Sequence, residues 1–150
     1  MKALFYILTF GWVLSSILLA VSDALKVNNK TIPSKYTEIA GLSIVIAILC
    51  FGYMNAFAMD IYQIAWLVVS LGLLRLAVYN ISYVVTYNIA RKGNAFKTHL
   101  PLGYLGEDPI DSLFKGFLSW TNFPQGLFMI NVYIISFVLG LSFISNYVII

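Results

Sequence analysis

Charged side chains are scarce in this chain of 150 residues. Asp, Glu, Lys and Arg make up 10% of it, whereas soluble domains carry about 25%. With one cysteine and one histidine, the chain can form no internal disulfide and offers neither paired zinc ligands nor a recognisable nucleophile–histidine motif. The net charge of +3 is too small to indicate nucleic acid as a partner. We therefore expect a protein that is not an enzyme, with no catalytic residues, no metal site and no cofactor.

Long apolar stretches fill most of the sequence, which is 61% hydrophobic. About 20 apolar residues cross the roughly 30 Å hydrocarbon core of a bilayer. Four stretches meet this length: residues 3–25, 39–58, 61–89 and 127–150. The first also has the features of a cleavable signal peptide, and we interpret it as a retained membrane helix. The sequence thus predicts an all-α integral membrane protein with four transmembrane helices, forming a single domain over residues 1–150.

Small residues four positions apart recur in three of these stretches. In membranes, such pairs allow helix backbones to approach closely, and this packing replaces the hydrophobic driving force of soluble proteins. The pairs are Gly11/Ser15, Ser16/Ala20, Gly52/Ala56 and Ser136/Gly140. The third stretch has only Gly72 near Ser70, so we expect its polar residues to make the helix contacts instead. The pattern predicts a packed four-helix bundle.

Basic residues concentrate in two of the connections between the stretches. The first connection contains Lys26, Lys30 and Lys35, and the third contains Arg91, Lys92, Lys97 and Lys115, whereas the opposite side has Lys2. Because positively charged loops stay in the cytoplasm, this bias predicts cytoplasmic Lys-rich loops and both termini outside. We expect the membrane to be a bacterial inner membrane or a viral membrane.

Arg75 is the charged residue that lies well inside a predicted span. A guanidinium near the bilayer centre costs at least ~2.5 kcal/mol on insertion scales. Helical spacing places polar side chains on the same side of the third span, from its middle to its cytoplasmic end: Arg75, Tyr79, Ser82, Tyr83, Thr86 and Tyr87, with Asn80 and Asn88 on a neighbouring face. The candidate intramembrane polar stripe, or partner contact, is therefore Arg75, Tyr79, Asn80, Tyr83 and Tyr87.

Three interpretations of Arg75 remain open at this point. It could snorkel to an interface or be held by Asn55, Asn131 and backbone carbonyls; it could meet a carboxylate of a partner chain or a lipid phosphate; or the stripe could line a ligand or ion path. One arginine cannot relay protons, because it never deprotonates. The acidic residues of the neighbouring segments are expected at span ends, away from Arg75: Asp23, Glu38 and Asp60.

Residues 93–125 form a polar insert that is too long for a simple connection and too polar to span. Asp108 and Pro109 predict a helix start, with Asp108 as the N-cap. An apolar stripe follows at helical spacing and ends with a tryptophan: Ile110, Leu113, Phe114, Phe117, Leu118 and Trp120. This pattern is typical of an amphipathic interfacial helix lying flat on the membrane, and packing on a partner protein is the alternative. Because capping explains Asp108 and Asp111, we do not interpret the nearby Glu107 and His99 as metal ligands.

The leading functional hypothesis is a small, non-enzymatic accessory or structural subunit of a larger membrane assembly. That assembly could be a respiratory or photosynthetic complex, a secretion machine or a virion membrane. The expected partners are the lipid bilayer and other membrane protein subunits, or further copies of the chain. The alternative is a small oligomeric transporter or channel, with a holin-like pore as a variant. The third hypothesis is a membrane enzyme that acts on lipid at the loop between His99 and Asp111.

Overall fold

The computed structural model describes the chain except for residues 1, 56–58, 93–98, 105–108, 122 and 146–150. The described residues form five helices: α1 (Lys2–Val27), α2 (Thr31–Asn55), α3 (Ile61–Ala90), α4 (Pro109–Thr121) and α5 (Gln125–Phe143). Four of them, α1, α2, α3 and α5, are long and apolar enough to cross a membrane. The predicted fold class is confirmed: the chain is an all-α integral membrane protein with a short helix between its third and fourth spans.

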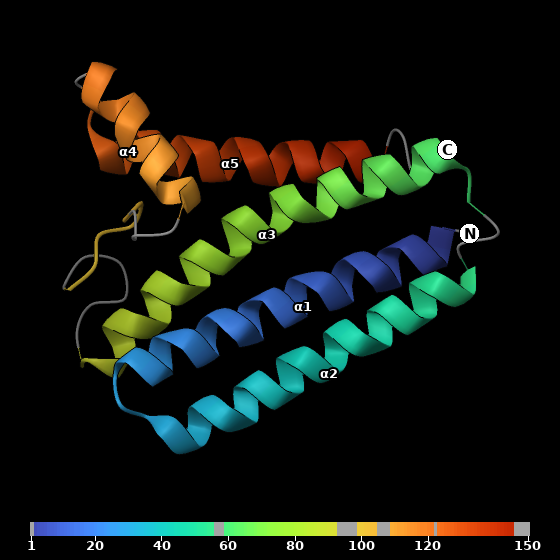
Figure 1. Cartoon of the computed structure of the whole chain (residues 1–150), viewed down its shortest axis with the longest axis horizontal. Helices are drawn as coiled ribbons and strands as arrows, with labels where there is room; N and C mark the ends of the chain where they lie inside the picture. Colours follow the sequence, from blue (N-terminus) through green and yellow to red (C-terminus); the bar gives the residue numbers. More distant parts are fainter. Residues whose placement is uncertain (1, 56–58, 93–98, 105–108, 122, 146–150) are drawn as a thin grey trace.

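The four spanning helices lie side by side in one row, in the order α2, α1, α3, α5 (Figure 1). α1 packs against α2 and α3, and α5 packs against α3. The α1–α2 connection and the end of α3 lie at the same end of the row (Figure 1). Each of the four spanning helices exposes large apolar side chains.

The start of α2 differs from the prediction. The helix begins at Thr31 rather than at residue 39, so the connection from α1 is short. Pro33 fits in the first turn of α2, because amide groups there have no helical acceptor. Ser34 is also fixed to α1: its hydroxyl donates to the carbonyl oxygen of Ser22 at 3.1 Å, and the Ser22 hydroxyl donates to the carbonyl oxygen of Ser34 at 3.0 Å. The predicted loop is therefore wrong in length, and Lys35 lies within α2.

The start of α3 is set by a reciprocal cap. The Asp60 carboxylate accepts from the backbone N–H of Gln63 at 2.8 Å. In return, the side-chain oxygen of Gln63 accepts from the backbone N–H of Asp60 at 3.3 Å. This capping box satisfies two amide groups that the first helical turn leaves without partners. α3 then runs to Ala90, one residue beyond the predicted end at 89.

Small residues set the close approaches between the helices, as the sequence predicts. A Cβ added at Gly11 would lie 2.8 Å from the end of the Ile48 side chain, so that side chain of α2 would have to move. A Cβ added at Gly140 would lie 2.9 Å from the Leu74 side chain and 3.0 Å from the carbonyl oxygen of Ser70. On α3, the close approach to α5 lies at Ser70, a small polar residue that is fully buried.

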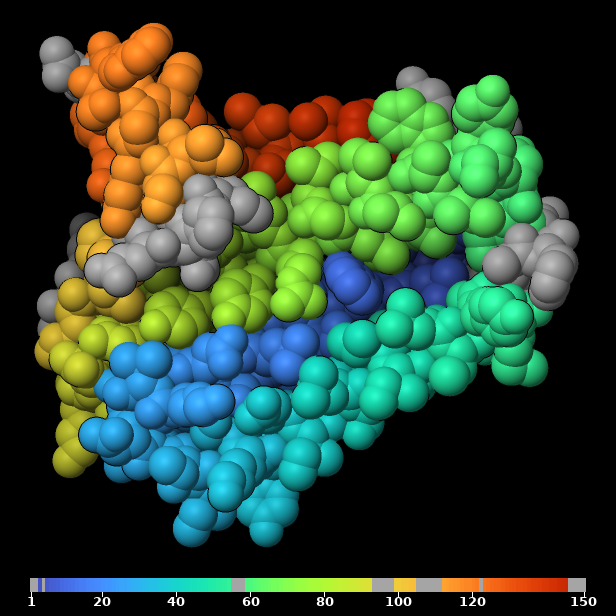
Figure 2. Space-filling view, in the orientation of Figure 1, coloured from blue at the N-terminus to red at the C-terminus, as the bar shows by residue number. Residues whose placement is uncertain are grey.

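α4 lies across the first part of α5 at the end of the row and stands out from it (Figures 1 and 2). Leu118 is buried in a cluster with Met129 and Tyr133 of α5 and Ala77 of α3. The Phe114 ring lies 6.0 Å from the Phe128 ring, measured between centroids. α4 starts at Pro109 as predicted. Its proposed N-cap, Asp108, lies outside the described residues, as do Glu107 and the final part of the predicted fourth span.

Candidate functional site: a polar ladder along α3

Arg75 lies in the middle of α3, and its charge rests against aromatic rings. Its guanidinium carbon, Cζ, lies 5.7 Å from the centroid of the Trp12 ring and 5.6 Å from that of the Tyr79 ring. The Trp12 ring is fixed in turn, because its Nε1–H donates to the carbonyl oxygen of Leu71 at 2.8 Å. Leu71 lies one turn before Arg75, so this bond brings an aromatic face of α1 to the cation.

Tyr79 links Arg75 to an acidic residue of α1. The Tyr79 hydroxyl donates a hydrogen bond to the carboxylate of Asp23. Asp23 lies in the last part of α1, where its carboxylate is exposed. The cation and the carboxylate therefore share one tyrosine rather than forming a direct pair. Asp23 lies near the end of α1, as expected, and its carboxylate meets the polar stripe there through Tyr79.

Two further tyrosines continue the array toward the end of α3. The Tyr83 and Tyr87 rings stack with centroids 6.1 Å apart, and the Arg91 guanidinium lies 4.7 Å from the centroid of the Tyr87 ring. Arg91 Nε–H also donates to the Asn28 side-chain oxygen at 2.8 Å. We call the residues that repeat every fourth position along α3 the polar ladder: Arg75, Tyr79, Tyr83, Tyr87 and Arg91.

The structure thus brings four of the five predicted stripe residues into the ladder, but not Asn80. The Asn80 amide donates to the carbonyl oxygen of Leu76, one turn earlier in its own helix, at 2.7 Å. Asn131, suggested as a support for Arg75, likewise donates to its own helix, at Leu127, and is exposed. The side chain of Asn55 lies outside the described residues. Among the described residues, the support observed for Arg75 is aromatic, which sequence reasoning did not consider.

Sequence reasoning missed the contribution of α1. Trp12 and Asp23 are separated by 11 residues, which is about three helical turns and places them on one face. Ser16 belongs to the same face and is fully buried. This spacing was a usable signal: a tryptophan, a serine and an aspartate share one side of an apolar helix. It could not say which helix that side would meet.

Asn88 has a separate role, at the end of α3. Its side-chain oxygen accepts from the Leu100 amide at 2.8 Å and from the His99 amide at 3.2 Å, and its Nδ2–H donates to the Leu100 carbonyl oxygen at 2.9 Å. The side chain is fully buried, and it bonds both the N–H and the C=O of Leu100. Farther along this loop, Gly103 adopts a φ of 89° and packs against Gly126 at the start of α5. The loop is therefore clamped between α3 and α5.

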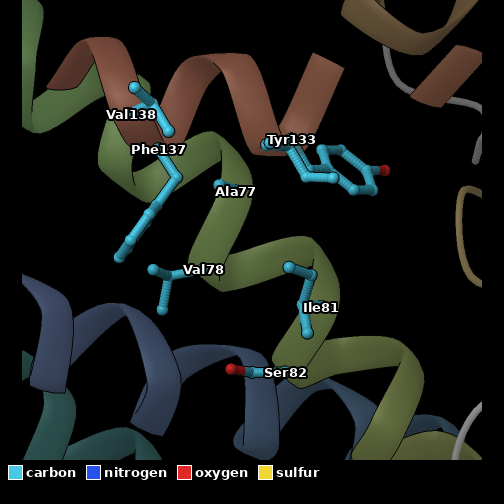
Figure 3. Close-up of a pocket in the computed structure, with 8 residues that line it drawn as sticks. Ala77, Val78, Ile81, Ser82, Tyr133, Phe137 and Val138 are labelled. Atoms are coloured by element: carbon cyan, nitrogen blue, oxygen red, sulfur yellow. The ribbon is translucent and has the colours of Figure 1, made fainter. Parts of the chain in front are cut away.

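A crevice of about 330 Å³ lies between α3 and α5 (Figure 3). Its walls are mainly apolar and include Ala77, Val78 and Ile81 from α3 and Phe137 and Val138 from α5. Of the predicted polar side of α3, Ser82 reaches this crevice, whereas the ladder residues do not line it. An apolar lining offers few ligands to a passing ion, so this crevice gives the ion-path interpretation little support.

Side chains suited to metal binding are dispersed. Among the residues that the structure describes, no three His, Cys, Asp or Glu side chains come together as a possible metal site. The cysteine, Cys50, lies exposed on α2. The chemistry available at the ladder is therefore hydrogen bonding and charge, supplied by two guanidinium groups, three phenol groups and one carboxylate.

No known protein family, curated protein or solved structure matches this chain.

Proposed function

We propose that this protein is a non-enzymatic subunit of a larger membrane assembly and that another transmembrane subunit binds along its polar ladder. The observation that carries this proposal is the state of Arg75. Among the described residues, its guanidinium contacts two aromatic faces and donates to no protein acceptor. Arginine has five N–H donors, and in hydrocarbon no water is present to accept from them.

The ring contacts hold the cation without neutralising it. Each cation–π contact contributes about 0.5–2 kcal/mol, whereas placing arginine in the membrane centre costs at least ~2.5 kcal/mol. Two rings therefore offset a comparable amount, which makes Arg75 tolerable in an isolated chain. The donors remain available, and Arg75 is partly exposed at the surface of the row. A partner group that accepts hydrogen bonds from these N–H donors would therefore bind most favourably at Arg75.

The depth of Arg75 favours a protein partner over a lipid headgroup. It lies 14 residues after Ile61 and 15 before Ala90, which at 1.5 Å per residue places it about 21–22 Å from either end of α3. Lipid phosphates lie outside the roughly 30 Å hydrocarbon core. We infer that the partner supplies an Asp or Glu carboxylate from a transmembrane helix, and that the tyrosine hydroxyls of the ladder bind its polar groups nearer the surface.

The orientation is part of the same proposal. The connection from α1 to α2 lies at the same end of the row as the end of α3 (Figure 1). Lys26, Lys30 and Lys35 lie in or next to this connection, and Arg91 and Lys92 directly follow α3. The positive-inside rule favours a cytoplasmic position for this end and an outside position for the chain termini. We propose a bacterial inner membrane or a viral membrane, in which the assembly could be a respiratory, photosynthetic, secretion or virion complex.

The proposal is tested by purification in a gentle detergent followed by native mass spectrometry. The wild-type protein is compared with Arg75→Leu, with Arg75→Lys, which keeps the charge, and with Asn80→Leu. Asn80 is the matched control because it is a polar residue of α3 whose side chain, among the described residues, donates to a carbonyl of its own helix. Circular dichroism checks that each variant keeps its helices.

We expect the wild type and Asn80→Leu to purify with another membrane protein in fixed stoichiometry. Arg75→Leu should lose that protein, and Arg75→Lys should retain at least part of it. A wild-type protein that purifies as a lone monomer or a symmetric homo-oligomer would contradict the proposal. So would an Arg75→Leu variant that keeps every partner.

The alternative function is an oligomeric transporter or channel, with a holin-like pore as a variant. The ladder favours it in one respect, because its hydroxyls run from the middle of α3 to its end. A single row of helices would need further copies to enclose a path. Conductance in liposomes that contain only the purified protein would support this alternative. Loss of lipid turnover in His99→Ala would instead support an enzyme that acts on lipid.

A further inference from the structure

α4 presents three faces of different character. At roughly 100° per residue, Leu113, Phe117 and Trp120 fall within one narrow strip of the helix surface. Phe114 and Leu118 form a second face about a third of a turn away. The third face is polar and consists of Ser112, Lys115 and Ser119. The predicted apolar stripe therefore divides into two faces rather than one.

The second face is already occupied within the chain. Leu118 is buried against Met129 and Tyr133, and Phe114 contacts the Phe128 ring of α5. These contacts fix the rotation of α4 about its own axis. The direction in which each of the other two faces points is therefore determined by the fold rather than by a free rotation of the helix.

The strip formed by Leu113, Phe117 and Trp120 is exposed. Leu113 and Trp120 are 75% and 90% accessible, and Phe117, at 55%, borders the packed face because its ring centroid lies 5.7 Å from that of Phe128. The strip lines a shallow groove of about 390 Å³ together with Gly116 and with Ser112 and Ser119 of the polar face. A Cβ added at Gly116 would meet nothing within 4 Å, so this side of the helix is open.

We propose that this strip inserts into the lipid bilayer, at the boundary between headgroups and acyl chains, and so anchors the end of the row at which α4 lies. α4 lies across α5, which spans the membrane (Figure 1). With the face of Phe114 and Leu118 held against α5, the strip and the polar face are the two faces left to meet the bilayer and the water. The apolar strip suits the hydrocarbon side, and the polar face suits the aqueous side.

The chemistry of both faces matches a bilayer surface. Tryptophan is enriched at membrane–water interfaces, where its amphipathic ring is most stable. Lys115 lies on the polar face, where an anionic headgroup would attract it. The same end of the row carries Arg91 and Lys92, so the lipid favoured here is an anionic phospholipid. This inference requires only that the four helices span a membrane, and it is independent of the proposed partner subunit.

Site-directed spin labelling of the full chain tests the inference. Replacing the single cysteine by Cys50→Ser gives a cysteine-free background. Labels are then placed one at a time with Leu113→Cys, Phe117→Cys and Trp120→Cys on the strip, and with Ser112→Cys and Ser119→Cys as matched controls on the polar face. The protein alone is reconstituted in phosphatidylcholine–phosphatidylglycerol liposomes. Collision with oxygen, which dissolves in lipid, is compared with collision with a water-soluble nickel chelate.

We expect the strip labels to collide with oxygen and to be several-fold less accessible to the nickel chelate than the polar-face labels. Strip labels as accessible to nickel as the controls would overturn the proposal, because the strip would then lie in water. Strip labels protected from both reagents would also overturn it, since a second copy of the chain would then cover the strip. Using three strip positions keeps the result interpretable if one substitution prevents folding.

Discussion

Replacing Asn88 by alanine should release the loop that joins α3 to α4. Asn88 is fully buried and binds three backbone groups of this loop: the amides of His99 and Leu100 and the carbonyl of Leu100. No other side chain of the described residues pairs with the loop at both an amide and a carbonyl. The substitution therefore removes the clamp while leaving the apolar packing of α3 nearly unchanged.

The magnitude follows from the groups left without partners. A buried donor or acceptor that loses its partner costs about 1–3 kcal/mol. The His99 bond is the longest of the three at 3.2 Å, and His99 is exposed, so its amide regains a water partner. The two groups of Leu100 then account for roughly 2–6 kcal/mol. The loop lies at the end of the spanning row, where water can partly hydrate these two groups. We therefore expect a loss of about 3 kcal/mol, in the lower part of this range.

Hydrogen exchange measured by mass spectrometry in lipid nanodiscs reports this loss directly. Since about 1.4 kcal/mol corresponds to a tenfold change, exchange of the Leu100 amide should accelerate by about two orders of magnitude. Asn80→Ala is the control, because it removes the same side chain from the same helix. The Asn80 side-chain amide donates to a backbone carbonyl within α3, so its loss should change the stability by less than about 0.5 kcal/mol. Equal exchange at Leu100 in both variants would refute the clamp.

Two further substitutions probe the contacts between helices. Gly140→Ala should destabilise the α3–α5 pair by about 1–3 kcal/mol in detergent-induced unfolding, because the new methyl group would crowd Ser70. Gly72→Ala, with nothing nearby, should be neutral or slightly stabilising, and equal effects would contradict this packing. Trp12→Phe keeps a ring at Arg75 but removes the hydrogen bond across α1 and α3, so it should lower the free energy of unfolding by about 1 kcal/mol. An unchanged unfolding curve would show that this bond does not stabilise the pair.

The sequence was sufficient to predict the spans but not the order in which they pack. The ends of α3 and the start of α4 follow from local chemistry: Asp60 and Pro109 favour helix starts wherever the rest of the chain lies. The start of α2 was misplaced because Thr31 and Pro33 look like loop residues until Ser34 is paired with Ser22 on α1. That pairing depends on tertiary contact, which a local pattern does not contain.

The composition of the candidate site was harder to predict for a related reason. In lipid, apolar residues cover both the packed and the exposed sides of a helix, so periodicity does not identify the neighbour. The regular spacing from Arg75 to Tyr87 could be recognised on α3 alone. Asp23 could not be assigned to it, because its distance from Tyr79 depends on how α1 and α3 are aligned along each other. The division of the α4 stripe into a packed and an open face depends on α5 in the same way.

The order of helices in the row also divides the chain into two helical hairpins. α1 with α2, and α3 with α5, are antiparallel neighbours, and the hairpins meet along a single seam between α1 and α3. Described hydrogen bonds cross this seam from Trp12, Tyr79 and Arg91, beside an apolar cluster of Phe5, Leu8 and Leu67. Within the hairpins, small and apolar residues mediate much of the packing, and the Ser22–Ser34 bonds join α1 to α2. The seam cannot close until α3 has entered the membrane, because α1 and α2 precede it in synthesis. Hydrogen bonds between specific residues then fix how far along each other α1 and α3 lie. Apolar surfaces in lipid could not fix this alignment.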